Sequence, residues 1–153
     1  MKRMQKGAYA LIADGARALL VENIGTALAP ELAVIRREEQ ENPPSGAQGT
    51  DKPGRMPDPG QGQRSAVENT DWHQLAEDRF AAGIAEMLGK LAQKGAFREI
   101  ILVAPPKTLA ELREKMPGAV RDRVVAEINK DLTGMPLDKI GVRIKEILDE
   151  MSG

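Results

Sequence analysis

Short apolar runs separated by turn residues make up the first third of the chain. The first run extends from Ala8 to Ala13 and is followed by Asp14-Gly15, a turn signal. A second run covers 17–22 and a third covers 32–35. Adjacent short runs joined by a tight turn are typical of a β-hairpin. We therefore expect three strands in an antiparallel meander.

A helical spacing of apolar residues begins after residue 70. Asp71 and Gln74 form a capping-box pattern, which predicts a helix that starts at Asp71. Gly95 stands at the expected C′ position and predicts its end. The apolar face between them consists of Trp72, Ala76, Phe80, Ile84, Met87, Leu88 and Leu91.

The remaining third alternates between apolar runs and helical patterns. The continuous apolar run 100–104 predicts a strand that is buried on both faces. Pro105-Pro106 predicts the start of a helix, for which Thr108 and Glu111 could form a cap, and Pro117 predicts its end. Val124–Ile128 could be a fifth strand, with helix as the alternative. A last helix is expected from near Pro136, with Leu137, Ile140, Ile144, Ile147 and Leu148 on one face.

The predicted element order is β-β-β-α-β-α-β-α over a single α/β domain, residues 1–153. A meander followed by alternating helices and strands predicts a mixed five-stranded sheet with helices packed on it. This is the element order of ribonuclease H-like folds. Fold alone does not give function.

A flexible loop is expected at about residues 40–68. The window from Gln40 to Ala66 holds five of the ten prolines and five of the fifteen glycines, and almost no aliphatic residue. Such a segment cannot bury enough apolar area to offset the entropy that ordering it would cost. A loop of this length within a domain is either functional or a disordered insert.

Composition narrows the classes of function. The net charge of −1 gives no overall positive field, so any binding of nucleic acid has to be local. Without cysteine, disulfides, thiolate metal sites and cysteine nucleophiles are excluded. The apolar run 8–13 is too short for the core of a signal peptide, and no run is long enough to span a membrane. We expect a cytoplasmic protein.

The residues needed for common enzyme chemistries are missing from the pattern. Asp14 closes the first strand, where a ribonuclease H-type nuclease places a metal ligand, but no acidic residue follows the run 100–104, so we interpret Asp14 as a turn residue. His73 is the only histidine, and we interpret it as a solvated polar residue rather than a zinc ligand. No hydrolase elbow or nucleotide-binding motif occurs. We expect neither a metal nor a cofactor.

The predicted loop holds the remaining candidate chemistry. Lys52, Arg55 and Arg64 stand among glycines. Arginine pairs with phosphate groups in a bidentate manner, and glycine permits close approach of the backbone. The loop could therefore contact nucleic acid, although Asp51 and Asp58 dilute its charge. The alternative is an inert disordered insert.

Several segments resemble the bacterial host attachment protein family, which implies a role in attachment to host cells. The resemblance extends over nearly the whole chain and is carried by 10–18, 50–55, 71–73, 80–81, 102–106 and 130–133. None of these residues explains adhesion.

The same layout is similar to the central domain of eukaryotic and archaeal release factors and of Pelota. In release factors, a meander leads to a loop with Gly-Gly-Gln, whose glutamine helps water to cleave peptidyl-tRNA on the ribosome. Gly62-Gln63 matches the last two residues of that motif, and Gln61 replaces its first glycine. Pelota-like proteins lack the motif but still bind ribosomes. The resemblance therefore implies ribosome binding, with a catalytic role for Gln63 only if the chain is release-factor-like.

The sequence thus favours a non-enzymatic binding module that associates with the ribosome or tRNA. The candidate nucleic-acid-binding residues are Lys52, Arg55, Gly62, Gln63 and Arg64. The alternative is a protein-interaction or regulatory domain with an inert loop and a protein partner. The pattern predicts no membrane association and leaves the oligomeric state open.

Overall fold

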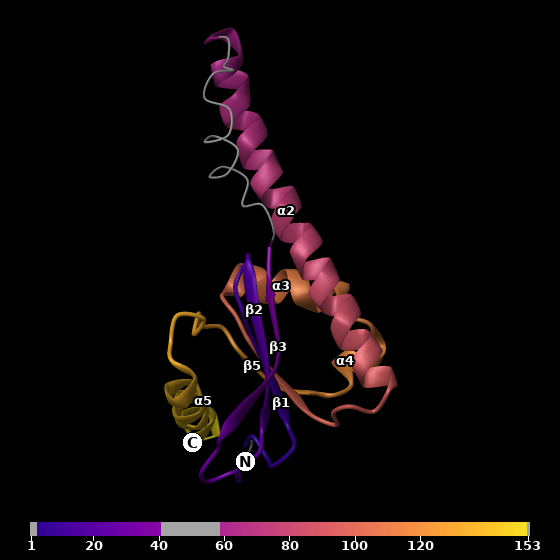
Figure 1. Cartoon of the computed structure of the whole chain (residues 1–153), viewed down its shortest axis with the longest axis vertical. Helices are drawn as coiled ribbons and strands as arrows, with labels where there is room; N and C mark the ends of the chain where they lie inside the picture. Colours follow the sequence, from indigo (N-terminus) through magenta and orange to yellow (C-terminus); the bar gives the residue numbers. More distant parts are fainter. Residues whose placement is uncertain (1–2, 41–58, 153) are drawn as a thin grey trace.

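A computed structural model describes residues 3–40 and 59–152, and the side chains of 3–40 and 72–151. Five strands form one mixed sheet in the order β3-β2-β1-β4-β5 (Figure 1). The strands are β1 (Tyr9–Ala13), β2 (Arg17–Asn23), β3 (Leu32–Glu39), β4 (Ile100–Val103) and β5 (Val124–Ile128). The predicted fold class, a mixed five-stranded α/β sheet, is confirmed.

The pairing follows the predicted meander and crossovers. β2 pairs with β1 and with β3 in antiparallel fashion, whereas β4 pairs with β1 and with β5 in parallel. β1 and β4 are central and fully buried, which explains their uninterrupted apolar sequence. Val124–Ile128 is a strand, so the helix alternative for this segment is wrong.

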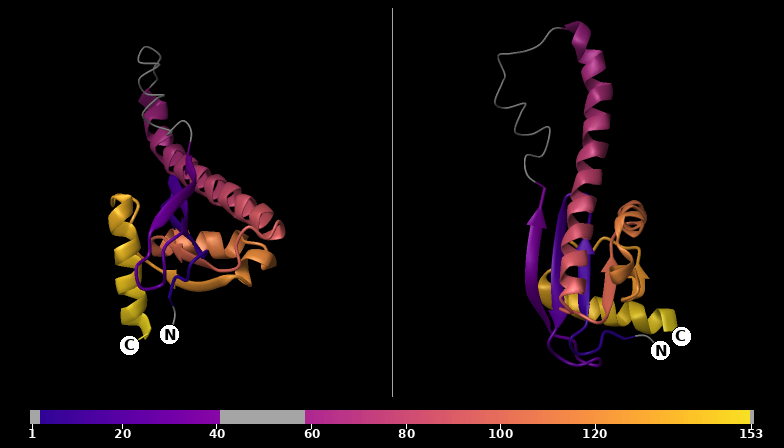
Figure 2. Two further views of the ribbon diagram at one scale, coloured as in Figure 1. Left: turned by 60° about the horizontal axis from the view of Figure 1, so that its bottom comes forward. Right: turned by 90° about the vertical axis from the view of Figure 1, so that its right-hand side faces the viewer.

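Helices cover both faces of the sheet. One face carries α2 (Pro59–Gln93), α3 (Pro106–Lys115) and α4 (Gly118–Arg121), and the other carries α5 (Leu137–Ser152) (Figure 2). Because successive residues of a strand point to opposite faces, β1 contributes to both layers of the core. Leu11 packs in the α2 layer, and Ile12 packs in the α5 layer.

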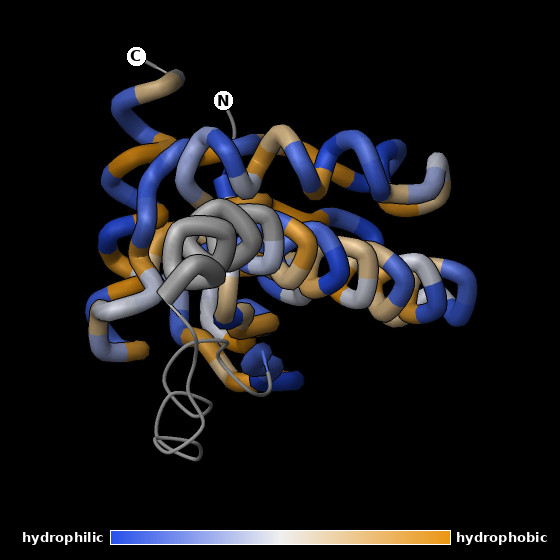
Figure 3. The backbone as a smooth tube through the Cα atoms, turned by 90° about the horizontal axis from the view of Figure 1, so that it is seen from above, coloured by the Kyte–Doolittle hydropathy of each residue, from blue (hydrophilic) through white to orange (hydrophobic). Residues whose placement is uncertain are grey.

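The hydrophobic faces of the helices account for these layers. Ile84 and Leu88 of α2 are buried against one side of the sheet, and Ile140 and Ile144 of α5 are buried against the other. Hydrophobic and hydrophilic residues alternate along both helices, as expected when only one face of a helix is buried (Figure 3).

The start of α2 differs from the prediction. The helix begins at Pro59, so Asp71 lies inside it and is not its N-cap. Proline is well tolerated in the first helical turn, and the glutamine, arginine, alanine and glutamate that follow favour a helix, whereas Gly60 and Gly62 disfavour it. Once the helix is nucleated, each further residue adds a hydrogen bond at low cost. The predicted end is confirmed, because Gly95 has φ +74° and Ala96 N–H bonds to Leu91 O, as in a Schellman motif.

Three further details correct the prediction. The N-cap of α3 is Pro105, without a side-chain cap, because Thr108 is buried and Glu111 bonds to α2 instead. Pro117 is followed by the short helix α4, which the sequence pattern did not predict. Of the predicted loop at 40–68, residues 41–58 lie outside the described part of the chain, and residues 59–68 belong to α2, so the loop prediction is wrong for them.

Candidate functional site

The candidate site is the edge of the sheet at which the parallel strands β1, β4 and β5 end. Ligands of open α/β sheets bind at this edge. The β1–β2 turn, the start of α3 and the connection from β5 to α5 all lie here. The chain also leaves β3 at this edge, and α2 extends beyond it (Figure 1). Chemistry-bearing residues from distant parts of the sequence therefore meet at one end of the molecule.

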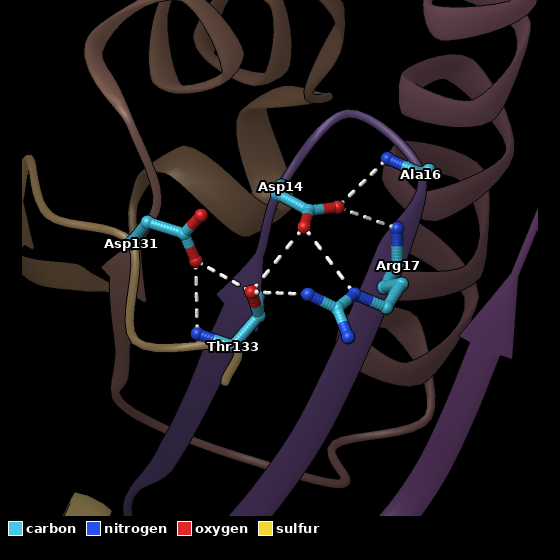
Figure 4. Close-up of polar contacts among 5 residues, drawn as sticks. All are labelled: Asp14, Ala16, Arg17, Asp131 and Thr133. Atoms are coloured by element: carbon cyan, nitrogen blue, oxygen red, sulfur yellow. Dashed lines mark hydrogen bonds and ion pairs between the residues drawn. The ribbon is translucent and has the colours of Figure 1, made fainter. Parts of the chain in front are cut away.

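Asp14 organises the β1–β2 turn. Its Oδ1 accepts hydrogen bonds from the backbone N–H groups of Ala16 and Arg17, each at 2.8 Å (Figure 4). Its Oδ2 lies 3.3 Å from Nε of Arg17 and forms an ion pair with it. This is the geometry of an Asx turn, so the interpretation of Asp14 as a turn residue is confirmed.

Thr133 joins this turn to the connection between β5 and α5. Its Oγ1 accepts a hydrogen bond from Nη2 of Arg17 at 3.1 Å and lies 3.2 Å from Oδ2 of Asp14. Asp131 completes the group, because its Oδ1 is hydrogen-bonded to both the hydroxyl and the backbone N–H of Thr133 (Figure 4). We call Asp14, Arg17, Asp131 and Thr133 the turn network.

Hydrogen bonding determines the charge state of Asp14. Burial acts to raise the pKa of this carboxyl group, but the N–H groups of Ala16 and Arg17 and the guanidinium of Arg17 outweigh burial and lower the pKa below its usual value. Asp14 is therefore ionised at neutral pH. An ionised aspartate that accepts bonds from the turn stabilises the turn and holds Arg17 in place.

A hollow of about 410 Å³ lies beside the turn network. Ile12 and Leu19 contribute apolar surface, while Arg17, Arg37 and Thr133 contribute hydrogen-bond donors. Glu38 and Glu39 also line it, which makes its charge mixed. The described lining contains no histidine, serine or cysteine. Its donors and apolar surface can contact a ligand.

A second polar cluster braces α2 against α3 at the same edge. Gln74 of α2 accepts a hydrogen bond from Lys107 Nζ at 2.7 Å and donates one to Glu111 Oε2 at 2.9 Å. Lys107 also forms an ion pair with Glu77 at 3.2 Å. We call Gln74, Glu77, Asp78, Lys107 and Glu111 the helix brace. It fixes the direction in which α2 leaves the sheet.

Burial and nearby carboxylates raise the pKa of Glu111. Burial raises its pKa, and the nearby carboxylates of Asp78 and Glu77 raise it further, although the hydrogen bond from Gln74 acts in the opposite direction. The pKa of Glu111 is therefore above its usual value. This edge thus contains one carboxyl group held in its charged form and one that retains its proton to higher pH.

The predicted nucleic-acid-binding residues are only partly within the described chain. Lys52 and Arg55 lie outside the described residues. Gly62, Gln63 and Arg64 belong to α2, not to a loop, and their side chains are not among those described. His73 is exposed, as expected for a solvated residue.

Sequence reasoning missed Arg17, Arg37 and Thr133. The aspartate-to-arginine spacing of the β1–β2 turn is a local signal that could have indicated Arg17. The segment 130–133 was noted only as part of a resemblance, and nothing local shows that it meets a turn 119 residues away. Within the described residues, no group of three or more histidine, cysteine or acidic residues is arranged to hold a metal ion.

None of the helices described here combines the length and the apolar character needed to cross a bilayer. Taken together, the sheet order, the two helical layers and the extended α2 define an α/β domain with a polar, braced edge and a long protruding helix.

The comparison with protein families identifies the family of this chain. Residues 8–144 match the model of bacterial archaeo-eukaryotic release factor family 12, so the chain belongs to that family. The predicted resemblance to release factors is thereby confirmed at the level of family, whereas the resemblance to the host attachment family is not supported.

The similarity of this chain to individual proteins is low. No curated protein matches the chain. A solved structure, that of the archaeal translation termination factor aRF1, is similar with a TM-score of 0.48 and 11% sequence identity. The similarity covers 97% of this chain and 41% of that protein, so the chain spans less than half the length of the termination factor.

Proposed function

We propose that this chain is a translation-related binding module that associates with the ribosome or with tRNA. The observation that carries the proposal is the match of residues 8–144 to a release factor family. The architecture is compatible with it, because α2 extends beyond the sheet and the helix brace fixes its direction (Figure 1). A long helix held rigidly at its base can present residues to a partner at a distance from the core.

The contact residues in this proposal are Lys52, Arg55, Gly62, Gln63 and Arg64. Their chemistry supports it, because arginine and lysine pair with phosphate groups and glycine allows close approach of the backbone. The overall charge of −1 implies that such binding depends on this local segment and not on the field of the whole molecule.

Co-sedimentation of variants with ribosomes tests these contacts. Replacing Arg55 and Arg64 by alanine should weaken binding and reduce its dependence on salt. Two phosphate contacts account for a roughly tenfold loss of affinity between about 50 and 200 mM salt. The thermal melting temperature should not change, since arginine is rarely a residue of an apolar core.

A matched control removes the same charge from the opposite edge of the sheet. Lys94 and Arg98 are exposed and lie between the end of α2 and the start of β4. Alanine at both positions should leave ribosome binding unchanged. Equal losses in the two double variants would show that binding follows net charge and not the proposed segment.

Gln63 has a role only if the module assists cleavage of peptidyl-tRNA. Gln63→Ala should then spare binding and lower cleavage. Binding without any cleavage by the wild-type chain would leave the module as a binding protein and remove Gln63 from its chemistry.

A further inference from the structure

The only tryptophan of the chain is exposed on α2. Trp72 was predicted on the apolar face of the helix, but 43% of its surface is accessible. The guanidinium carbon of Arg79 lies 5.8 Å from the centre of the indole ring, in a cation–π contact. Trp72 precedes Arg79 by two helical turns, so both lie on the same side of α2.

A groove begins beside this pair and runs between α2 and β3. Its volume is about 300 Å³. On the α2 side it is lined by Arg79, Phe80 and Gly83, and on the β3 side by Arg36 and Glu38, among others. Gly83 leaves open space where a side chain would stand, because no atom lies within 4 Å of a Cβ placed there. The groove is therefore lined by Arg79 and has a low wall at Gly83, and the indole of Trp72 contacts Arg79 without lining the groove itself.

The two arginines of the groove differ in their partners. Arg36 is held by Oε2 of Glu38 at 3.0 Å from Nη2. Within the described residues, Arg79 has no carboxylate at ion-pair distance, and its guanidinium lies over the ring of Trp72. Among the described residues, the α2 side thus offers a cation without an ion-pair partner, while Glu38 and Glu39 make the β3 side unfavourable for an anion.

We propose that Trp72 and Arg79 form a binding site for an unpaired nucleotide of RNA. The base stacks on the accessible face of the indole, and the adjacent phosphate pairs with the guanidinium of Arg79 on the α2 side of the groove. Stacking on aromatic side chains together with arginine contacts to phosphate is the chemistry by which proteins hold single-stranded RNA. This inference rests on the proposed function, and it adds the class of partner and a site on the described part of the chain.

A protein partner is the other occupant that an exposed tryptophan can take. Tryptophan and arginine are also common at the centres of protein interfaces. RNA is favoured here because the cation beside the indole has no ion-pair partner in the described part of the chain and lines an open groove. The experiment below separates the two partners.

Intrinsic fluorescence tests the site directly, because all tryptophan emission comes from Trp72. The full chain is titrated with a single-stranded oligoadenylate RNA and, in parallel, with an RNA duplex of the same length. We expect saturable quenching by the single strand and much weaker quenching by the duplex, since paired bases are not free to stack. Absence of quenching by the single strand overturns the proposal.

Variants then assign the contacts by fluorescence anisotropy of labelled oligoadenylate. Trp72→Ala and Arg79→Ala should each weaken binding by about fivefold or more, the low end of what one base stack contributes. Leu75→Ala is the matched control, since Leu75 is also 43% exposed and lies one turn away on the same helix. Affinity unchanged in both site variants, or reduced equally in the control, overturns the proposal. Because Trp72 and Arg79 are exposed, the variants should fold, which circular dichroism verifies.

Ribosome co-sedimentation distinguishes failure of this site from failure of the proposed function. If the wild-type chain binds ribosomes but not oligoadenylate, and Trp72→Ala binds ribosomes normally, the nucleotide site is wrong and the proposed function stands. If Trp72→Ala loses ribosome binding while oligoadenylate causes no quenching, the partner at Trp72 is a protein and the nucleotide site is again wrong. If the wild-type chain binds neither ribosomes nor tRNA, the proposed function itself fails.

Discussion

Asp14 serves as both the acceptor of a turn and the anion of an ion pair. Its two oxygens divide these roles: Oδ1 accepts the N–H groups of Ala16 and Arg17, and Oδ2 faces the guanidinium of Arg17. The two roles can be separated by substitution, because asparagine keeps the acceptor but removes the charge.

Asp14→Ala should lower the free energy of unfolding by about 1 kcal/mol at neutral pH, the usual net value of a partly exposed hydrogen-bonding group. Asp14→Asn should retain most of that stability. The folded pKa of Asp14 lies below 3.8, so its ionic contribution is present above 3.8 and is lost as pH falls through the folded pKa. Urea unfolding at several pH values measures this. If the unfolding free energies of the wild-type chain and of Asp14→Asn fell in the same way at acid pH, the ionic role of Asp14 would be contradicted.

Leu102 reports the packing of the central strand. Its side chain is only 1% exposed, on a strand with helices on both faces of the sheet. Leu102→Ala should cost about 2–5 kcal/mol in unfolding free energy, the usual range for such a change in a core. Leu28→Ala is the control, because Leu28 is 65% exposed and should cost less than about 0.5 kcal/mol. Similar losses at both positions in denaturant melts would show that the core is wrongly placed.

Two features of single residues were not predicted from the sequence: the exposure of Trp72 and the contact between Asp14 and Thr133. The sequence pattern assigned Trp72 to the apolar face of α2 with Ile84 and Leu88, and this assignment is wrong. At 100° per residue, Trp72 is rotated by about 120° from Ile84 and by about 160° from Leu88. Trp72 lies in the part that the core does not cover and is exposed. The contact between Asp14 and Thr133 depends on how two distant connections meet, and no local pattern encodes it.

At the scale of elements, strands were predicted best where burial imposes the pattern. β4 is buried on both faces, and its apolar run gave its position almost to the residue. β3 continues through Arg36 to Glu39, beyond the predicted end, because an edge strand with exposed residues needs no apolar sequence. The start of α2 was missed because helix formation at Pro59 needs only compatible residues, whereas the capping pattern at Asp71 is a local signal that the longer helix overrides.

The raised pKa of Glu111 in the helix brace leads to a prediction about the stability of the chain. Glu111 has a raised pKa, so at neutral pH its ionised form is unfavourable beside Asp78 and Glu77. A raised pKa in the folded state means that the stability contributed by the protonated group is lost as pH rises through that pKa. Glu111→Gln removes the repulsion, and the new amide can still accept from Gln74 and can donate to Asp78.

Glu111→Gln should therefore raise the free energy of unfolding at pH 7 by less than about 1 kcal/mol, since solvent screens the site. At pH below the usual glutamate value the variant and the wild type should converge. Thermal melts at both pH values measure the difference. The compared quantity is the free energy of unfolding of Glu111→Gln minus that of the wild type. A value lower at pH 7 than at low pH would contradict the proposed crowding of carboxylates.

The whole molecule combines a two-layered core with one polar edge. The turn network, the helix brace and the base of α2 all lie where the parallel strands end, and α2 extends from there (Figure 1). Family membership makes a translation-related role the best-supported function, and the cytoplasmic location expected from the sequence stays a prediction. The fold class followed from the order of apolar runs, whereas the braced edge became visible only with the register of the sheet and its connections.

The central claim is association with the ribosome or tRNA, and sedimentation of the purified wild-type chain with ribosomes through a sucrose cushion tests it most directly. Parallel samples at about 50 and about 200 mM salt measure how strongly phosphate contacts contribute. The account predicts that the chain pellets with ribosomes at the lower salt, that the bound fraction falls at the higher salt, and that added tRNA either competes or binds on its own. A chain that stays in the supernatant at the lower salt and shows no affinity for tRNA would contradict the account.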